Sequence, residues 1–223
     1  MLTPVIDHPW DPEPREAIAL QRRLAERVIL RDDLPGPPRT IAGIDVGLPR
    51  GAGVARAAVV VLALDGLETI EQAVAQEPVR YPYIPGLLSF REAPAILAAL
   101  ARLTTEPDIL MFDGQGYAHP RRMGIATHLG LVLDRPAVGC AKSRLYGSGP
   151  EPPEERGGVA LLRHGEEVVG AALRTRTRVK PVYVSVGHRL SLDTAIALVL
   201  GTGAGYRLPE PTRRAHQLAS MSR

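Results

Sequence analysis

Short apolar runs alternate with segments of helical spacing along the chain, a pattern that predicts an α/β fold in one domain, residues 1–223. A first helix is expected after Pro14, with apolar positions from Ile18 to Ile29. An antiparallel meander of three strands follows, in which Asp65-Gly66 is a typical hairpin turn. The strands predicted for the meander are Thr40–Val46, Ala57–Leu64 and Glu68–Val79.

Helices and strands alternate in the rest of the chain. A helix with apolar spacing is predicted from Ser89 to Leu103, and the apolar run Ile109–Phe112 is typical of a strand buried on both faces. The elements predicted after it are a helix over Met123–Leu133, a strand at Ala137–Ala141, a hairpin of Val159–Leu162 and Val168–Arg178, a strand at Val182–Val186, and helices capped by Ser191 and Thr212.

The sheet is expected to be mixed, because an antiparallel meander is followed by strands that helices connect in parallel. The first strand then lies in the centre, since both groups of strands need it as a neighbour. This order places Asp45 in the middle of the sheet and Asp113 at the end of an adjacent strand. Open α/β sheets bind their ligands at the carboxyl ends of such strands.

Composition narrows the class of protein. No apolar run approaches the ~18 residues of a membrane-spanning helix, and the amino terminus lacks the basic and apolar regions of a signal peptide. The single cysteine, Cys140, excludes an internal disulfide and fits a reducing compartment. A cytoplasmic protein with no membrane segment is therefore expected.

Charge is unevenly distributed. The formal net charge is +3, but residues 1–111 carry −4 and residues 112–223 carry +7, which suggests a polyanionic partner for the second half. The basic side chains of Arg174, Arg176, Arg178 and Lys180 alternate, so an extended strand would place all of them on one face, suited to phosphates. An exposed sheet edge guarded by charge explains the same pattern.

Two acids stand in unusual places. Asp45 interrupts an apolar strand, where a carboxylate is costly unless it is paired with an arginine, hydrogen-bonded to the backbone or bound to a metal. Asp113 follows a buried strand at Asp113-Gly-Gln-Gly116, where it either starts a turn or faces a ligand. If the two carboxylates are neighbours, a divalent cation offsets their repulsion, and oxygen ligands suit Mg²⁺ or Mn²⁺.

Three further residues are candidates at the same edge. Glu92 is either a metal ligand or the last residue of a capping box, Ser89-Phe-Arg-Glu92. Lys142 follows the next strand, where it either adds a cation to the site or is an ordinary solvated lysine. His119 follows Asp113 by six residues, close enough to orient a water or contact a phosphate.

Taken in order, the motifs from about Ile41 to His216 resemble those of the endonuclease V family. The resemblance implies a ribonuclease H-like fold and a Mg²⁺-dependent DNA repair endonuclease that recognises deoxyinosine. Such enzymes nick the second phosphodiester on the 3′ side of the lesion and leave a 5′-phosphate and a 3′-hydroxyl. The motifs are Gly43-Ile-Asp-Val46, Pro82-Tyr-Ile-Pro-Gly86, Ser89-Phe-Arg-Glu92, Asp113-Gly-Gln-Gly-Tyr-Ala-His-Pro120, Lys142-Ser143, Gly187-His-Arg-Leu190 and Tyr206-Arg-Leu-Pro-Glu-Pro-Thr212.

The resemblance also assigns roles to residues. Lys142 and His119 match residues near the scissile phosphate, and Tyr83 matches the family's wedge residue. Its loop also holds Pro82, Ile84 and Pro85. The acids that match the family's metal ligands are Asp45, Glu92 and Asp113, with His216 as a further ligand. The residues expected around the displaced base are Gly86, Leu88, Gly114, Ile125 and Gly139.

Two alternatives to this function stay open at the level of sequence. One is the cleavage of RNA that contains inosine, since family members differ in this activity. The other is a catalytically silent nucleic-acid-binding module with the same fold, against which the intact set of three acids argues. In each case a monomer is expected.

Overall fold

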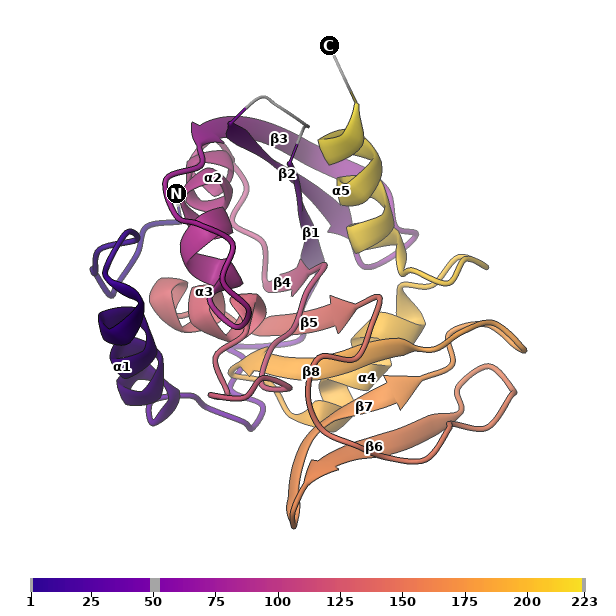
Figure 1. Cartoon of the computed structure of the whole chain (residues 1–223). Coiled ribbons are helices and arrows are strands. Elements are labelled where there is room, and N and C mark those ends of the chain that lie inside the picture. The colour runs from indigo at the N-terminus through magenta and orange to yellow at the C-terminus, as the bar shows by residue number, and fades with distance from the viewer. Residues whose placement is uncertain (1, 49–52, 222–223) are drawn as a thin grey trace.

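The strands of the computed structural model, which describes residues 2–48 and 53–221, form one eight-stranded sheet in the order β3-β2-β1-β4-β5-β8-β7-β6 (Figure 1). The strands are β1 (Thr40–Gly47), β2 (Val54–Ala63), β3 (Thr69–Pro78), β4 (Ile109–Phe112), β5 (Ala137–Ala141), β6 (Val159–His164), β7 (Glu167–Leu173) and β8 (Val182–His188).

The pairing of these strands confirms the predicted mixed sheet. The meander β1–β2–β3 is antiparallel, whereas β1 pairs with β4 and β4 with β5 in parallel. β1 therefore has one antiparallel and one parallel neighbour, as expected of a central strand. The remaining strands β8, β7 and β6 continue the sheet in antiparallel fashion. This is the α/β arrangement that the resemblance implied.

Helices cover both faces of the sheet, which explains why β4 and β5 are apolar throughout. On one face α2 and α3 pack on β1, β2 and β4, and on the other α4 and α5 pack on the same strands and on β5 and β8. The helices are α1 (Pro14–Ala25), α2 (Leu88–Leu100), α3 (Ile125–Leu133), α4 (Leu192–Gly201) and α5 (Glu210–Ser220).

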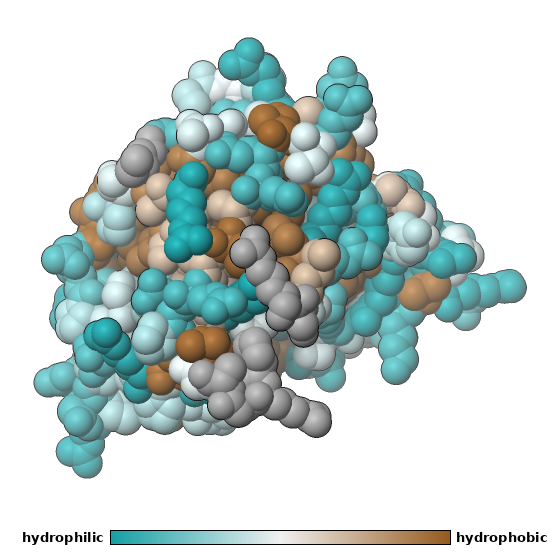
Figure 2. Space-filling model, turned by 90° about the horizontal axis from the view of Figure 1, so that it is seen from above, coloured by the Kyte–Doolittle hydropathy of each residue, from teal (hydrophilic) through white to brown (hydrophobic). Residues whose placement is uncertain are grey.

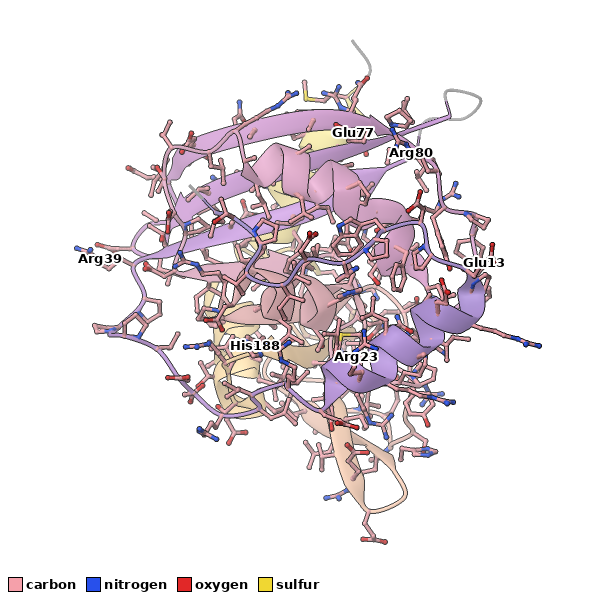
Figure 3. The ribbon with its side chains drawn as sticks, turned by 90° about the vertical axis from the view of Figure 1, so that its left-hand side faces the viewer. Glu13, Arg23, Arg39, Glu77, Arg80 and His188 are labelled. Carbon is pink, nitrogen blue, oxygen red and sulfur yellow. The ribbon has the colours of Figure 1, made fainter. Side chains whose placement is uncertain are left out.

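Helix α1 forms an outer layer on the side of the molecule shown in Figure 3, where Glu13 and Arg23 mark its two ends. Its buried face packs in one apolar cluster with residues of α2 and α3. The members of this cluster from the three helices are Ala17, Leu20, Leu24, Phe90 and Leu131.

A close contact fixes α5 on the central strand. A Cβ atom added at Gly43 of β1 would lie 1.9 Å from the carbonyl oxygen of Pro211 in the first turn of α5. Only a residue without a side chain allows this approach. The contact brings the later turns of α5, including His216, over the end of β1.

The boundaries of the first and last helices differ from the predicted ones. The first helix ends at Ala25 instead of continuing to Ile29, because the Ile29 N–H donates to His188 Nδ1 and its carbonyl accepts from the Arg189 N–H. The last helix begins at Glu210, so that Thr212, the predicted cap, lies inside its first turn. The cap at Ser191 is confirmed.

The surface is that of a globular domain with no large apolar patch in view. Seen from above Figure 1, hydrophilic side chains cover much of the face and hydrophobic ones appear between them in small areas (Figure 2). Within residues 2–48 and 53–221, no helix is long and apolar enough to cross a membrane. Cys140 is buried in β5, as expected of a small core residue.

The contact between Gly43 and α5 leads to a testable prediction. Gly43→Ala should lower the free energy of unfolding by roughly 3 kcal/mol or more, because the added methyl collides with backbone that cannot rotate away. Urea unfolding followed by circular dichroism measures the change. Gly36→Ala is the matched control, since a Cβ there meets nothing within 4 Å. Equal stability of the two variants would contradict the proposed packing of α5.

Candidate active site

The parallel pairing of β1 with β4 brings two acids to one edge of the sheet. Phe112 lies opposite Ile44 as the last pair of the register, and the Asp113 N–H donates to the Ile44 carbonyl at 2.9 Å. Asp45 and Asp113 are therefore the next residues of two adjacent strands. The predicted adjacency of these acids is confirmed.

Helix α5 adds a third candidate ligand. His216 Nδ1 lies 2.6 Å from Asp45 Oδ2, and one ligand atom each of Asp45, Asp113 and His216 lies within 4.8 Å of the others. The second oxygen of Asp45 accepts a hydrogen bond from the Val46 N–H at 2.8 Å. Asp45 thus has backbone and histidine partners. The His216 side chain is 49% exposed, so the cluster is open to solvent.

Lys142 joins the same cluster from the end of β5. Its Nζ lies 2.5 Å from Asp113 Oδ2 and 3.4 Å from His216 Nδ1. Apart from that ion pair, Asp113 Oδ2 is a buried oxygen without a hydrogen-bond partner among the described residues. Burial raises the pKa of Asp113 and the charge of Asp45 raises it further, while Lys142 acts in the opposite direction.

Glu92 faces this cluster from α2. Burial raises the pKa of Glu92 to about 8, and the charges of Asp45 and Asp113 add to this effect. It makes no hydrogen bond or ion pair with the residues that the structure describes, and it lies outside the group whose ligand atoms are within 4.8 Å. Both effects favour the protonated form of the Glu92 carboxyl.

The capping-box alternative for Glu92 is wrong. The cap position of α2 is Leu87, which makes no side-chain cap hydrogen bond, and Ser89 lies inside the helix. The Ser89 hydroxyl instead contacts Nδ1 of the buried His128 at 2.8 Å. Glu92 is therefore free of a capping role.

These residues fit a divalent cation. The set offers three carboxylates and one imidazole, and the buried Asp113 Oδ2, which the Lys142 ammonium pairs with, lies among them. Oxygen-rich sets of this kind suit Mg²⁺ or Mn²⁺. Residues Asp45, Asp113 and His216 would hold such an ion, with Glu92 adjacent.

The structure does not bring His119 together with the acids through any contact among the described residues. The His119 side chain is buried, and its Nε2 donates to the Gly86 carbonyl at 3.0 Å. Its Nδ1 accepts from the N–H groups of Arg121 and Met123. Burial lowers the pKa of His119 to about 4, which keeps the ring neutral in this arrangement.

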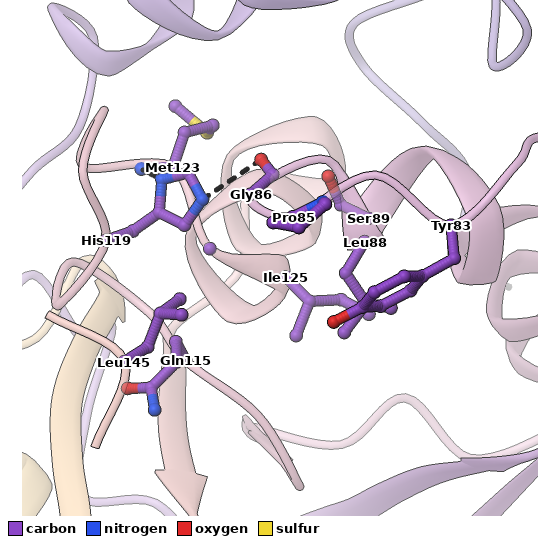
Figure 4. A pocket seen from close by; sticks show the side chains of 11 residues that line it. Tyr83, Pro85, Gly86, Leu88, Ser89, Gln115, His119, Met123, Ile125 and Leu145 are labelled. Carbon is purple, nitrogen blue, oxygen red and sulfur yellow. Dashed lines mark hydrogen bonds between the residues drawn. The ribbon is translucent and has the colours of Figure 1, made fainter. Parts of the chain in front are cut away.

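A largely apolar pocket is lined by residues from the same stretches of chain as the acids, and Figure 4 shows its lining side chains. It includes Gly86, Leu88 and Ile125, three of the residues predicted to surround a displaced base. The pocket and the acids share two stretches of chain, because Gln115 lines the pocket two residues after Asp113 and Ser89 lines it one turn before Glu92. The other lining residues are Tyr83, Pro85, His119, Met123, Gly124 and Leu145.

Gly114 and Gly139 lie behind the lining and not in it. A Cβ at Gly114 would meet Ile125 Cγ2 at 2.7 Å, and one at Gly139 would meet the backbone of Gly114 and Gly116 at 2.5–2.6 Å. Both glycines therefore let the loop after Asp113 pack closely against its neighbours. Their contribution to the pocket is to its shape.

Tyr83 projects from an irregular loop at the mouth of the pocket. The residue is 69% exposed, so its ring does not pack this loop onto the sheet. Figure 4 shows the ring standing at one side of the pocket, apart from His119 and Gly86. Ile84 packs inward against the cluster around α1 and so anchors the loop.

The predicted basic strand face at Arg174–Lys180 was wrong. β7 ends at Leu173, and Arg178 has a positive φ of 59°, so the stretch turns instead of extending. Arg174 is buried and donates to the carbonyls of Pro152, Pro153 and Val179, which leaves it a structural role. Arg176 and Arg178 are exposed, but they do not form a ridge with Arg174.

Sequence reasoning missed several residues of the pocket. Leu145 lines it although its side chain is 51% exposed, and Met123 and Gln115 contribute from the two ends of one loop. The only signal in the sequence was their nearness to Lys142 and Asp113. Which side of a loop faces a pocket depends on its folded path.

Comparison with known proteins identifies relatives of this chain. The Endonuclease V family model matches residues 22–217. An endonuclease V of Roseiflexus castenholzii is 54% identical over 222 residues, which cover 100% of this chain and 99% of the relative.

Two solved structures add to this. The endonuclease V of Streptomyces avermitilis superposes with a TM-score of 0.89 at 46% identity, covering 97% of this chain and 96% of that one. The endonuclease V of Ciona intestinalis, in complex with a DNA that contains an inosine followed by a ribo-adenosine, has a TM-score of 0.81 at 27% identity, over 92% and 95%. The chain belongs to the endonuclease V family of nucleases, enzymes that bind DNA and hydrolyse phosphodiester bonds.

Proposed function

We propose that this protein is a Mg²⁺-dependent endonuclease of cytoplasmic DNA repair that nicks DNA at the second phosphodiester 3′ to deoxyinosine. The observation that carries the proposal is the pairing of an apolar pocket with an acidic cluster on two shared stretches of chain. A base in the pocket would hold its own strand across the cluster, so recognition and cleavage would occur at a fixed separation. The chain acts as a single domain and as a monomer in this proposal.

The relatives support the nature of the ligand. The Ciona intestinalis structure contains DNA with an inosine, and the largely apolar pocket of the present chain offers the kind of surface that a purine base would contact. Leu88, Met123 and Ile125 offer apolar surface to a flat purine ring. Recognition of a base in this way requires that it first leave the stack, at a cost of a few kcal/mol.

The side chains of the cluster have separate tasks in cleavage. Asp45, Asp113 and Glu92, with His216, would hold the Mg²⁺, which when bound polarises a phosphate oxygen and lowers the pKa of a water. Hydrolysis at this site would leave a 3′-hydroxyl and a 5′-phosphate. Lys142, 40% exposed beside Asp113, is placed to offset negative charge on the phosphate.

Inosine-containing RNA is the second candidate substrate. The observation that favours it is the ribo-adenosine that follows the inosine in the DNA bound by the Ciona intestinalis protein. A ribose at that position would also have to fit beside the acidic cluster. A sugar 2′-hydroxyl is the group by which a protein distinguishes RNA from DNA.

A nicking assay tests the proposed function. A labelled duplex with a single deoxyinosine should be cut once, 3′ to the lesion, only when Mg²⁺ or Mn²⁺ is added. The same duplex with deoxyadenosine and a matched RNA with inosine are run beside it. If the enzyme cut the undamaged duplex equally well, or needed no divalent cation, the proposal would be wrong.

Removal of either central acid should abolish cleavage without unfolding the protein. Asp113→Asn and Asp45→Asn each take a charge out of a crowded site, so stability without metal should hold or rise. Saturating Mg²⁺ should raise the melting temperature of the unsubstituted protein and not that of the variants. Normal nicking rates in either variant would reject the assigned metal site.

The raised pKa of Glu92 predicts a pH dependence. Because its pKa is about 8 in the folded protein and near 4.5 in the unfolded chain, the unfolded state releases this proton first. Stability of the metal-free protein should therefore fall as the pH rises through this window. Glu92→Gln cannot titrate and should remove part of the fall. Urea unfolding of both proteins at pH 6.5 and pH 8 measures the change in the free energy of unfolding between these two pH values. An equal change in the two proteins would contradict the burial of Glu92.

Tyr83 should act in lesion exposure and not in bond cleavage. Stacking of an aromatic ring on a base is worth roughly 1–3 kcal/mol. Tyr83→Ala should therefore slow cleavage of paired deoxyinosine by about tenfold or more, with a much smaller loss on single-stranded substrate. Because the ring is exposed, the melting temperature should not change. An equal loss on both substrates would remove the wedge role.

A further inference from the structure

The backbone carbonyl of Gly86, at the end of the Tyr83 loop, accepts hydrogen bonds from three side chains. The Gly86 oxygen accepts from Gln21 Nε2 at 3.0 Å, from His119 Nε2 at 3.0 Å and from Arg121 Nη2 at 2.7 Å. Gly86 has a positive φ of 80°, and a Cβ atom there would lie 2.7 Å from Arg121 Nη2. A carbonyl has two lone pairs, so its hydrogen-bonding capacity is saturated and its position is closely defined.

Gln21 connects this carbonyl to the other walls of the pocket. It belongs to α1 and is completely buried. Besides Gly86, its Nε2 donates to the carbonyl of Met123 at 3.2 Å, and its Oε1 accepts from Arg121 Nε at 2.5 Å. These partners also settle the orientation of the amide, since its nitrogen faces two carbonyls and its oxygen faces a guanidinium.

The residues joined in this way come from separate segments that line one pocket. Gly86 belongs to the Tyr83 loop, His119 to the loop after β4, and Met123 to the turn before α3. The dashed bond between His119 and Gly86 in Figure 4 is one member of this network. Helix α1 itself supplies no residue to the pocket lining.

From this geometry we infer that Gln21 is a positioning residue for displacement of the base from the helix, because it holds the Tyr83 loop in place at the edge of the pocket. The inference rests on the proposed function, because it assumes that the pocket receives the displaced base. Without the amide, the Gly86 carbonyl keeps two donors, but Met123 and the Arg121 Nε lose their partner. The Tyr83 loop can then relax away from α3, so displacement of a paired base carries the added cost of ordering this loop, which the network orders in advance.

The test uses Gln21→Met, which keeps the volume of the side chain and removes its hydrogen bonds. In single-turnover reactions the variant should cut paired deoxyinosine roughly tenfold more slowly, since two or three buried hydrogen bonds are lost. Single-stranded deoxyinosine needs no displacement from a helix, so its cleavage should fall by no more than about threefold. A fluorescent 2-aminopurine placed next to the lesion reports unstacking of the helix. Without divalent cation, its fluorescence should rise less when the variant binds than when the unsubstituted protein binds.

Two further variants keep the test independent of folding. Leu24→Ala is the matched control, because Leu24 is a buried residue of the same helix and its truncation weakens packing without touching the network. It should lower the melting temperature at least as much as Gln21→Met and leave the ratio of rates on the two substrates unchanged. Arg121→Met breaks the network from a partly exposed loop position and should reproduce the effect of Gln21→Met.

The outcomes separate this inference from the proposed function. If the unsubstituted protein did not cut deoxyinosine, the proposed function would fail and the inference with it. If it did, equal losses on both substrates in Gln21→Met would overturn the inference alone. A changed substrate ratio in Leu24→Ala would overturn it too, since lost packing of α1 would then be sufficient.

Discussion

The parallel pairing of β4 with β1 is the constraint on which the rest of the site depends. It ends at Ile44 and Phe112, so that the next residue of each strand is an aspartate. Two carboxylates held side by side repel each other; Lys142 and His216 lie against them, and the charges of the two carboxylates help to raise the pKa of Glu92. Each of these groups comes from a different element. The fold therefore places two carboxylates so close together that a divalent cation between them would reduce their repulsion.

The helices around the sheet serve this arrangement through close backbone contacts. Gly43 admits α5 to the surface of β1 and with it His216, while α2 presents Glu92 to the cluster and Ser89 to the pocket. These contacts fix the acidic cluster relative to the helix that also contributes to the pocket. At the pocket, irregular chain comes from the Tyr83 loop, the loop after Asp113 and the loop after β5 that holds Leu145, and buried side chains hold the first two.

His119 contributes to the pocket and not to the acidic cluster. Its neutral ring joins two loops instead of contacting the acids, so its effect on cleavage would pass through the shape of the pocket. The same holds for Gly114 and Gly139, whose lack of side chains allows the loop after Asp113 to pack. The acidic cluster and the pocket are thus formed by separate sets of side chains that come from neighbouring positions of the same chain segments.

The sequence by itself determined the strands, the central place of β1 and the pairing of Asp45 with Asp113, because these follow from short apolar runs and from where they end. The ordered motifs also indicated the family. Tertiary structure alone decided that Arg174 is buried, that Ser89 does not cap its helix and that Gln21 reaches Gly86. Periodicity reports which face of an element is buried, but not which distant carbonyl or ring a polar side chain will meet. Those partners are set by how helices and loops pack in space.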